Sequence, residues 1–181
     1  MKKVLLVINN QQSPYSDFAQ MFTRIAQDSG QFESEVSEDR NSFTKLEAFD
    51  AVTLYIGGGK LTSAQEEGLA AFVRNGCGLL AVHASNAGLG QYDTYSNLVG
   101  SEFTGHDPLA PFEVNLEDDI DDILPRLNKS FQVTDECYQM KIRTDAPLRY
   151  FQYGNWRMER YPLGYLYNYG LGKVCYNALG H

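Results

Sequence analysis

The chain has 181 residues, of which 43% are hydrophobic, and its 23 acidic and 15 basic residues give a formal net charge of -8. This hydrophobic content excludes a disordered chain, and the acidity argues against binding to nucleic acid or to an anionic membrane surface. The length fits one domain over residues 1–181.

The first half of the chain alternates predicted strands and helices. Strands are predicted over residues 4–8, 32–36, 50–56 and 78–82. A helix follows the first strand and ends at Gly30, and one of its faces carries Phe18, Met21, Phe22 and Ile25. A second helix opens with the capping box Ser63-x-x-Glu66 and ends at Gly76, and its apolar face carries Leu69, Ala70, Phe72 and Val73. This order predicts a parallel sheet with helices on both faces.

The second half is less regular. A short helix is predicted over residues 92–99, and short strands over residues 111–115 and 130–134. The acidic stretch 117–122 between those strands is either a cation site or, as we prefer, a solvated loop. The tyrosine-rich tail predicts strands with a hairpin over residues 147–153, 163–169 and 173–177.

The apolar run over residues 4–8 is too short for a signal peptide, and no run reaches the about 20 apolar residues that span a bilayer. The 3 cysteines, Cys77, Cys137 and Cys175, lie far apart and form no CxxC pair. None has a histidine beside it in the sequence, which argues against a catalytic thiol. We therefore expect a cytoplasmic protein with reduced cysteines.

All 3 histidines lie in short motifs: His83 in AVHASN, His106 in TGHDP and His181 in NALGH. His83 directly follows a predicted strand, and His181 comes shortly after another. A neutral imidazole can move a proton near neutral pH or bind a metal. Because α/β proteins bind ligands at the carboxyl ends of their strands, these residues predict a small-molecule site.

Each histidine motif also has a purely structural interpretation. His83 is either a satisfied core residue or a site residue, and the polar Ser85 and Asn86 that follow favour the site. The segment around His106 is either a surface turn or a part of the site in which Asp107 orients the imidazole.

Two further motifs remain open in the same way. Gly57-Gly58-Gly59-Lys60 lies between a strand and a helix and is either a tight turn or a loop whose N–H groups hold an anion. It is neither a Walker loop nor a GxGxxG motif. In Asp135-Glu136-x-Tyr138, Glu136 and Tyr138 would share a face and supply acid/base or metal-binding groups, unless the segment is a solvated turn.

Several segments resemble the ThuA-like family, which is named for trehalose utilisation. They are YIGGGKLTSAQEEGLAAFVRNGCGLLAVHAS, GHDP, FQVTDECY and GKVCYNALGH, in this order and over nearly the whole chain. The resemblance implies a flavodoxin-like, three-layer α/β/α fold with a mostly parallel sheet, like that of class I glutamine amidotransferases. It also makes a carbohydrate, such as trehalose, another disaccharide or a keto-glycoside, the expected substrate.

The resemblance also points to a missing group. Amidotransferases of this fold carry a cysteine nucleophile on a sharp turn after a strand, and the matching stretch here places His83 at that position. Glutamine hydrolysis through a thioester is therefore not expected. The glycine loop matches the place of an oxyanion-hole donor, which could serve other chemistry. Members of that family usually continue past the motif that ends here at His181, so either a shortened member or a truncated sequence is expected.

We therefore predict an enzyme, a hydrolase or lyase, that acts on a sugar or sugar derivative. The predicted catalytic residues are His83, His106, Glu136, Tyr138 and His181. The predicted substrate-binding residues are Gly57, Gly58, Gly59, Ser85, Asn86, Asp107 and Trp156. In one variant a divalent metal such as zinc is held by His83, His106, Glu136 and His181. The alternatives are a non-catalytic carbohydrate-binding or regulatory protein and a structural subunit, and a homo-oligomer is left open.

Overall fold

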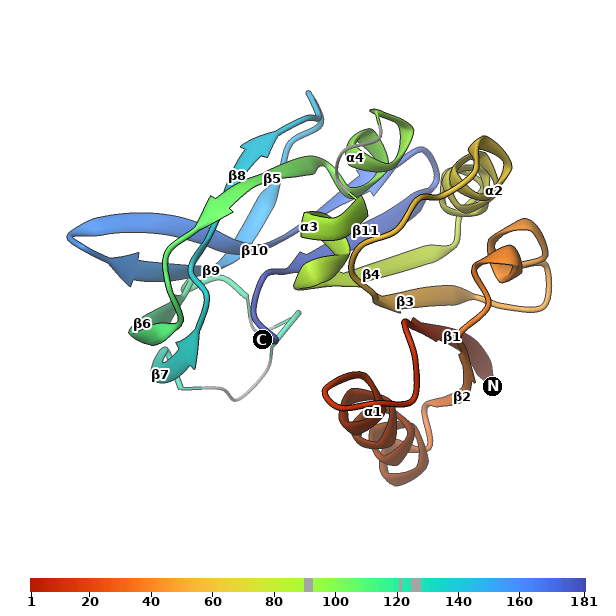
Figure 1. Cartoon of the computed structure of the whole chain (residues 1–181), viewed down its shortest axis with the longest axis horizontal. Coiled ribbons are helices and arrows are strands. Elements are labelled where there is room, and N and C mark those ends of the chain that lie inside the picture. Colours follow the sequence, from red (N-terminus) through yellow and green to blue (C-terminus); the bar gives the residue numbers. More distant parts are fainter. Residues whose placement is uncertain (90–92, 121, 125–127) are drawn as a thin grey trace.

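The computed structural model describes residues 1–89, 93–120, 122–124 and 128–181. A nine-stranded sheet with the order β2-β1-β3-β4-β11-β10-β9-β6-β7 runs through it (Figure 1). The first five strands are parallel: β2 (Phe32–Ser37), β1 (Lys2–Ile8), β3 (Ala51–Tyr55), β4 (Gly78–Val82) and β11 (Gly172–Asn177). Four antiparallel strands extend this part: β10 (Glu159–Tyr169), β9 (Arg149–Trp156), β6 (Ala110–Leu116) and β7 (Ser130–Asp135).

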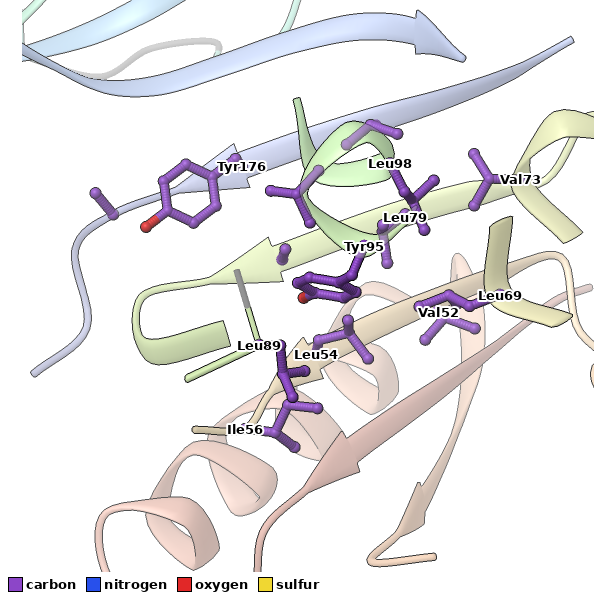
Figure 2. Close-up of a cluster of buried hydrophobic side chains, with 14 of the residues drawn as sticks. Val52, Leu54, Ile56, Leu69, Val73, Leu79, Leu89, Tyr95, Leu98 and Tyr176 are labelled. Atoms are coloured by element: carbon purple, nitrogen blue, oxygen red, sulfur yellow. The ribbon is translucent and has the colours of Figure 1, made fainter. Parts of the chain in front are cut away.

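Helices cover both faces of the parallel part, which confirms the predicted α/β class. Helix α1 (Tyr15–Ser29) packs on one face against Leu6, Ile8, Tyr55 and Val82. On the other face, α2 (Ser63–Arg74), α3 (Ala84–Leu89) and α4 (Asp93–Val99) enclose a larger core with β3, β4 and β11 (Figure 2). Continuous apolar strands such as β1 are explained by this burial on both faces.

Two details of the predicted helices are wrong. In α1, Phe22 is buried as predicted, but Met21 and Ile25 of the predicted apolar face are each 50% exposed, and Ala19 and Ala26 are buried instead. The small alanine side chains let the helix approach the sheet closely, so the face that contains them is the one that contacts the sheet. The capping box of α2 lies one residue earlier than predicted and uses the following pair: Thr62 and Gln65. Two S/T-x-x-E/Q patterns overlap here, and Thr62 is the residue with the extended backbone of an N-cap.

The predicted strands of the second half are present as β6, β7, β9, β10 and β11, and β10 and β11 form the expected antiparallel hairpin. The predicted helix over residues 92–99 corresponds to α4, with Tyr92 outside the described residues. In the acidic stretch, Asp118 and Asp119 are exposed as the loop interpretation expects, and Asp121 lies outside the described residues. A short 3-10 helix, η1 (Arg40–Thr44), was not predicted.

The sequence also did not predict a second, two-stranded sheet. It pairs β5 (Ser101–His106) with β8 (Tyr138–Ile142), and its register places His106 opposite Tyr138. The segment predicted as a polar turn therefore begins inside a strand. No helix in the described ranges has the length and apolarity to cross a membrane.

Candidate functional site

Several chain segments meet at one edge of the large sheet. The carboxyl ends of β4 and β11 lie side by side there, and Figure 1 shows the last residues of the chain near them. Strands β10, β9 and β6 lie between β11 and β7, and each neighbouring pair from β11 to β7 is antiparallel. Strand β7 therefore runs in the same direction as β11, and its carboxyl end lies at the same edge. The turn after β4, the tail after β11 and the β7–β8 connection therefore converge, as the strand-end rule predicts.

His83 forms the turn from β4 into α3 and is held rigidly. Its φ of 47° lies in the left-handed region, which is uncommon for a residue with a side chain. Its backbone N–H donates to the carbonyl of Asn177 at 2.7 Å, and its carbonyl accepts from the Tyr176 hydroxyl at 3.2 Å. The ring nitrogen Nδ1 is 2.7 Å from the carbonyl oxygen of Ala178. A carbonyl only accepts, so Nδ1 carries the proton and Nε2 presents a lone pair.

Glu136 is the residue on which the imidazoles converge. Its Oε2 is 3.6 Å from Nε2 of His83 and 3.4 Å from Nδ1 of His181. Its Oε1 is 3.5 Å from Nδ1 of His106. Three imidazoles from distant parts of the chain thus face one half-buried carboxylate, and the predicted gathering of the three imidazoles is present.

Tyr138 lies beside His83, as a predicted member of the same face. Its hydroxyl is 3.3 Å from Nε2 of His83, and the two rings are stacked with centroids 4.5 Å apart. Since Nδ1 holds the imidazole proton, the phenol donates this hydrogen bond. Burial, together with the nearby negative charges of Glu136 and Asp135, raises the pKa of Tyr138 well above its ordinary value, so its hydroxyl stays protonated.

His181 is fixed through the backbone of the tail. The buried carboxylate of Asp135 accepts hydrogen bonds from the N–H of Gly180 at 2.8 Å and of Glu136 at 2.7 Å, and it lies 3.4 Å from the N–H of His181. The hydroxyl of Tyr55 donates to the Gly180 carbonyl at 2.5 Å. Asp135 therefore ties the segment that carries Glu136 to the segment that carries His181.

His106 is held differently from the prediction. Its Nδ1 contacts the backbone carbonyl of Asp107 at 2.8 Å, so the carbonyl, not the carboxylate, orients the ring. The Asp107 carboxylate instead pairs with Arg157 at 3.2 Å. Because Nδ1 of His106 donates to a carbonyl, this nitrogen is not available to a metal in this arrangement.

The remaining predicted substrate-binding residues lie around this cluster in different ways. Gly57 adjoins the His83 turn, since a Cβ built on it would be 3.0 Å from Cβ of Ala84. Ser85 and Asn86 are fully buried, and Ser85 links β3 to α3 by donating to the Leu54 carbonyl. Such buried side chains can support a site but do not face a ligand directly.

Trp156 ends β9 at the same edge of the sheet. Its ring packs edge-on against Phe112 with centroids 6.3 Å apart, and the guanidinium of Arg157 lies 5.5 Å from its centroid. Its role as a flat surface for a sugar ring remains a prediction.

None of the three cysteines forms a disulfide: Cys77 directly precedes β4, Cys137 is buried, and Cys175 lies in β11. Burial raises the pKa of Cys137 and Cys175 to about 11, and it also raises that of Cys77. A thiol needs a lowered pKa to be a nucleophile at neutral pH, so this geometry does not activate them.

His83, Glu136 and His181 offer ligand atoms that all lie within 4.8 Å of one another. Four ligands placed about 2.1 Å from a zinc ion are separated by about 3.4 Å, which matches the 3.6 and 3.4 Å distances from Glu136 to the two imidazoles. The hydrogen bond from His83 to Ala178 is the outer contact that commonly orients a ligating imidazole. These three residues therefore fit a divalent metal, whereas His106, the fourth predicted ligand, does not join them.

The burial of His83 makes a prediction for the metal-free protein. Burial lowers the pKa of His83 below its ordinary value of 6.5, which outweighs the hydrogen bond to Ala178 and the nearby carboxylates. The unfolded chain then binds a proton that the folded chain does not. The contribution of His83 to the free energy of unfolding should therefore be fully present above pH 6.5 and decrease as the pH falls from 6.5 towards the lower pKa of the folded state.

Urea unfolding of the metal-free protein between about pH 5 and pH 8 measures this dependence. His83→Gln should flatten the curve in this window, and His106→Gln is the matched control that should leave its slope in place. An unchanged slope in the His83 variant would contradict the assignment.

Some residues around the site were missed by the sequence analysis. Asp135 was noted in its motif but was not chosen, because strand alternation suggested that only one carboxylate could face the site. Both lie at the cluster, because β7 ends at Asp135 and β8 begins only at Tyr138, so strand alternation does not apply to Glu136. Asn9, which donates to the Tyr15 hydroxyl and to the Gly57 carbonyl, directly follows β1, so the strand-end rule that found His83 could have found it. Tyr55 ends β3, so the same rule could have found it too, whereas nothing in the sequence pointed to Arg40, which donates to Asn9 and to the Gly58 carbonyl.

The comparisons with known proteins agree with this fold. The chain matches the ThuA family, described as trehalose utilisation, over residues 3–181. It is similar to a putative ThuA-like protein from Parabacteroides merdae (TM-score 0.81, 15% identity, 99% of this chain and 80% of that chain) and to one from Bacteroides uniformis (0.80, 16%, 99% and 82%). It is also similar to part of a beta-galactosidase from Bacillus circulans (0.68, 14%, 96% and 28%). It matches no curated protein.

Proposed function

Because this chain belongs to the ThuA family, we propose that it is an enzyme that acts on a sugar or sugar derivative at the cluster of His83, His106, Glu136, Tyr138 and His181. The observation that carries the proposal is the meeting of three imidazoles from distant segments at the Glu136 carboxylate. The family description of trehalose utilisation supports the substrate class. The beta-galactosidase that shares the fold is a sugar-cleaving enzyme by name, although only the fold links it to this chain.

Proton transfer is the chemistry that these residues support. The lowered pKa of His83 keeps its imidazole neutral near neutral pH, so Nε2 can accept a proton from a sugar hydroxyl or from a carbon next to a keto group. The Tyr138 hydroxyl, which stays protonated, can donate a hydrogen bond to an oxygen that gains negative charge. A hydrolase or lyase acting on disaccharides or keto-glycosides is consistent with these roles.

A divalent metal such as zinc would be held by His83, Glu136 and His181. When bound, it would supply Lewis acidity to a sugar oxygen or lower the pKa of a water. His106 and Tyr138 would then remain as the proton-carrying side chains beside it. The proposal also includes the absence of an amidotransferase reaction, because the resemblance to class I glutamine amidotransferases implies a cysteine nucleophile at the position of His83.

The test is turnover by the purified protein on disaccharides and their keto derivatives, first after treatment with a chelator and then with zinc, manganese or magnesium added back. We expect turnover on at least one keto-sugar or disaccharide, and His83→Ala should abolish it while circular dichroism shows an intact fold. Binding of the same sugars with no turnover under any of these conditions would instead establish the non-catalytic alternative.

We further propose a cytoplasmic location, which suits an acidic chain with reduced cysteines. A small-molecule carbohydrate as ligand and the absence of nucleic-acid and membrane partners belong to the same proposal.

A further inference from the structure

The order of the parallel strands creates a switch point beside the histidine cluster. Strand β1 lies between β2 and β3, and the helices that follow β1 and β3, α1 and α2, cover opposite faces of the sheet. The loops after these two strands therefore diverge, and open α/β sheets bind ligands in the crevice that forms at such a point. Here the diverging loops begin at Asn9 and at Gly57.

The side chain of Asn9 connects these two loops, and both its amide nitrogen and its amide oxygen take part in hydrogen bonds. Its Nδ2 donates to the Tyr15 hydroxyl and to the Gly57 carbonyl, each at 2.8 Å. Its Oδ1 accepts from the Gly57 N–H at 3.3 Å and from Nη2 of Arg40 at 3.0 Å. The Gly57 N–H is thus occupied and is not a free donor, contrary to what an oxyanion role for this group requires.

Arg40, at the start of η1, is placed over the glycine loop by these contacts. Its Nη2 also donates to the Gly58 carbonyl at 2.8 Å, and a Cβ on Gly59 would lie 2.8 Å from its Nη1. Gly58 and Gly59 have positive φ values of 68° and 75°, a backbone conformation that favours glycine, and Gly59 leaves room for the guanidinium beside it. The positively charged group is therefore held in a defined position before any ligand arrives.

This guanidinium has no carboxylate partner among the residues that the structure describes. Both of its described hydrogen bonds use Nη2, which leaves the N–H groups of Nη1 and Nε without an acceptor in the described chain. The acidic residues next to it in the sequence are engaged elsewhere: Glu38 accepts from Gln11 at 2.8 Å, and Asp39 caps η1.

We propose that Arg40 and the loop Gly57-Gly58-Gly59-Lys60 form a subsite for an oxyanion, the phosphate or carboxylate group of an acidic sugar derivative. The guanidinium fork matches oxyanion geometry, and the exposed N–H groups of Gly58 and Gly59 add donors. Gly57 lies close to the turn of His83, since a Cβ built on it would be 3.0 Å from Cβ of Ala84, so this subsite adjoins the histidine cluster. The inference that the ligand contains a sugar depends on the proposed function, whereas the inference of an anion subsite does not.

Calorimetric titration at low ionic strength tests the subsite with inorganic phosphate, gluconate and uncharged trehalose. We expect the anions to bind, and Arg40→Gln to weaken them about tenfold or more. Arg40→Lys should restore part of the affinity. Arg24→Gln, which removes an exposed arginine paired with Asp28 on α1, is the matched control and should change nothing. Tighter binding of phosphate would identify a phosphate ester, and tighter binding of gluconate a sugar acid.

The unmodified protein offers a second measurement, in case the Arg40 variants do not fold. In NMR spectra, phosphate should shift the amide signals of Gly58 and Gly59 and leave those of Gly170 and Gly172 unchanged. Absence of such shifts, or equal anion affinity in folded Arg40→Gln and unmodified protein, would overturn the subsite. If the anion binds but the histidine variants leave turnover unaffected, the subsite stands and the proposed function fails.

Discussion

Replacing Glu136 with glutamine should lower turnover by about 10²- to 10⁴-fold, the range that a positioned acid/base group contributes. Glutamine keeps the size of the side chain but removes the negative charge that faces the imidazoles of His83, His106 and His181. It also replaces one carboxylate oxygen by an NH₂ group, which cannot bind a metal. Steady-state kinetics on the sugar that the unmodified protein turns over gives the effect on kcat and on KM.

Metal binding by the same variant distinguishes an enzyme that holds a divalent metal at the cluster from one that works without a metal. If the cluster holds a divalent ion, zinc titration should show loss of binding in Glu136→Gln and in His181→Ala but not in His106→Ala, because His106 lies outside the three-residue group. Glu102→Gln is the control, since this carboxylate forms a partly exposed ion pair with Arg143. Turnover of Glu136→Gln within about twofold of the unmodified protein would contradict the assignment of this cluster as the catalytic site.

Replacing Gly172 with alanine should destabilise the fold by about 3 kcal/mol or more, because the added methyl group has no space. A Cβ at this position would lie 2.0 Å from the carbonyl oxygen of Val73 and 2.3 Å from that of Cys77. Both atoms belong to the backbone where α2 turns into β4, so neither can rotate away. The start of β11 would have to move from β4, and with it the strand that carries the tail to His181.

The free energy of unfolding in urea measures this effect. Gly30→Ala is the matched control: Gly30 has a φ of 60°, but no atom lies within 4 Å of its added Cβ. The control should therefore cost only the backbone strain, about 1 kcal/mol. A cost for Gly172→Ala no larger than that of Gly30→Ala would contradict the predicted clash.

The location of one part of the site could be predicted because it depends on local pattern. The apolar run before His83 indicates a buried strand, and the carboxyl ends of parallel strands meet at one edge of the sheet. The same rule placed His181 close to that edge. The face that α1 buries could not be inferred equally well, because its larger apolar residues do not all lie on the stripe that contacts the sheet.

The identity of the groups that meet was decided by tertiary structure. His83 and the Ala178 carbonyl that orients it are 95 residues apart, and Glu136 reaches the cluster only because the three antiparallel strands β10, β9 and β6 place β7 with its carboxyl end at the correct edge. Arg40 meets the glycine loop through the same kind of long-range placement. Sequence alone therefore determined the α/β alternation, the glycine loop and the strand-end histidines, since these follow from periodicity and backbone preference. Which carboxylate joins the imidazoles, and which cation faces the loop, follow from strand order and register, which local periodicity does not encode.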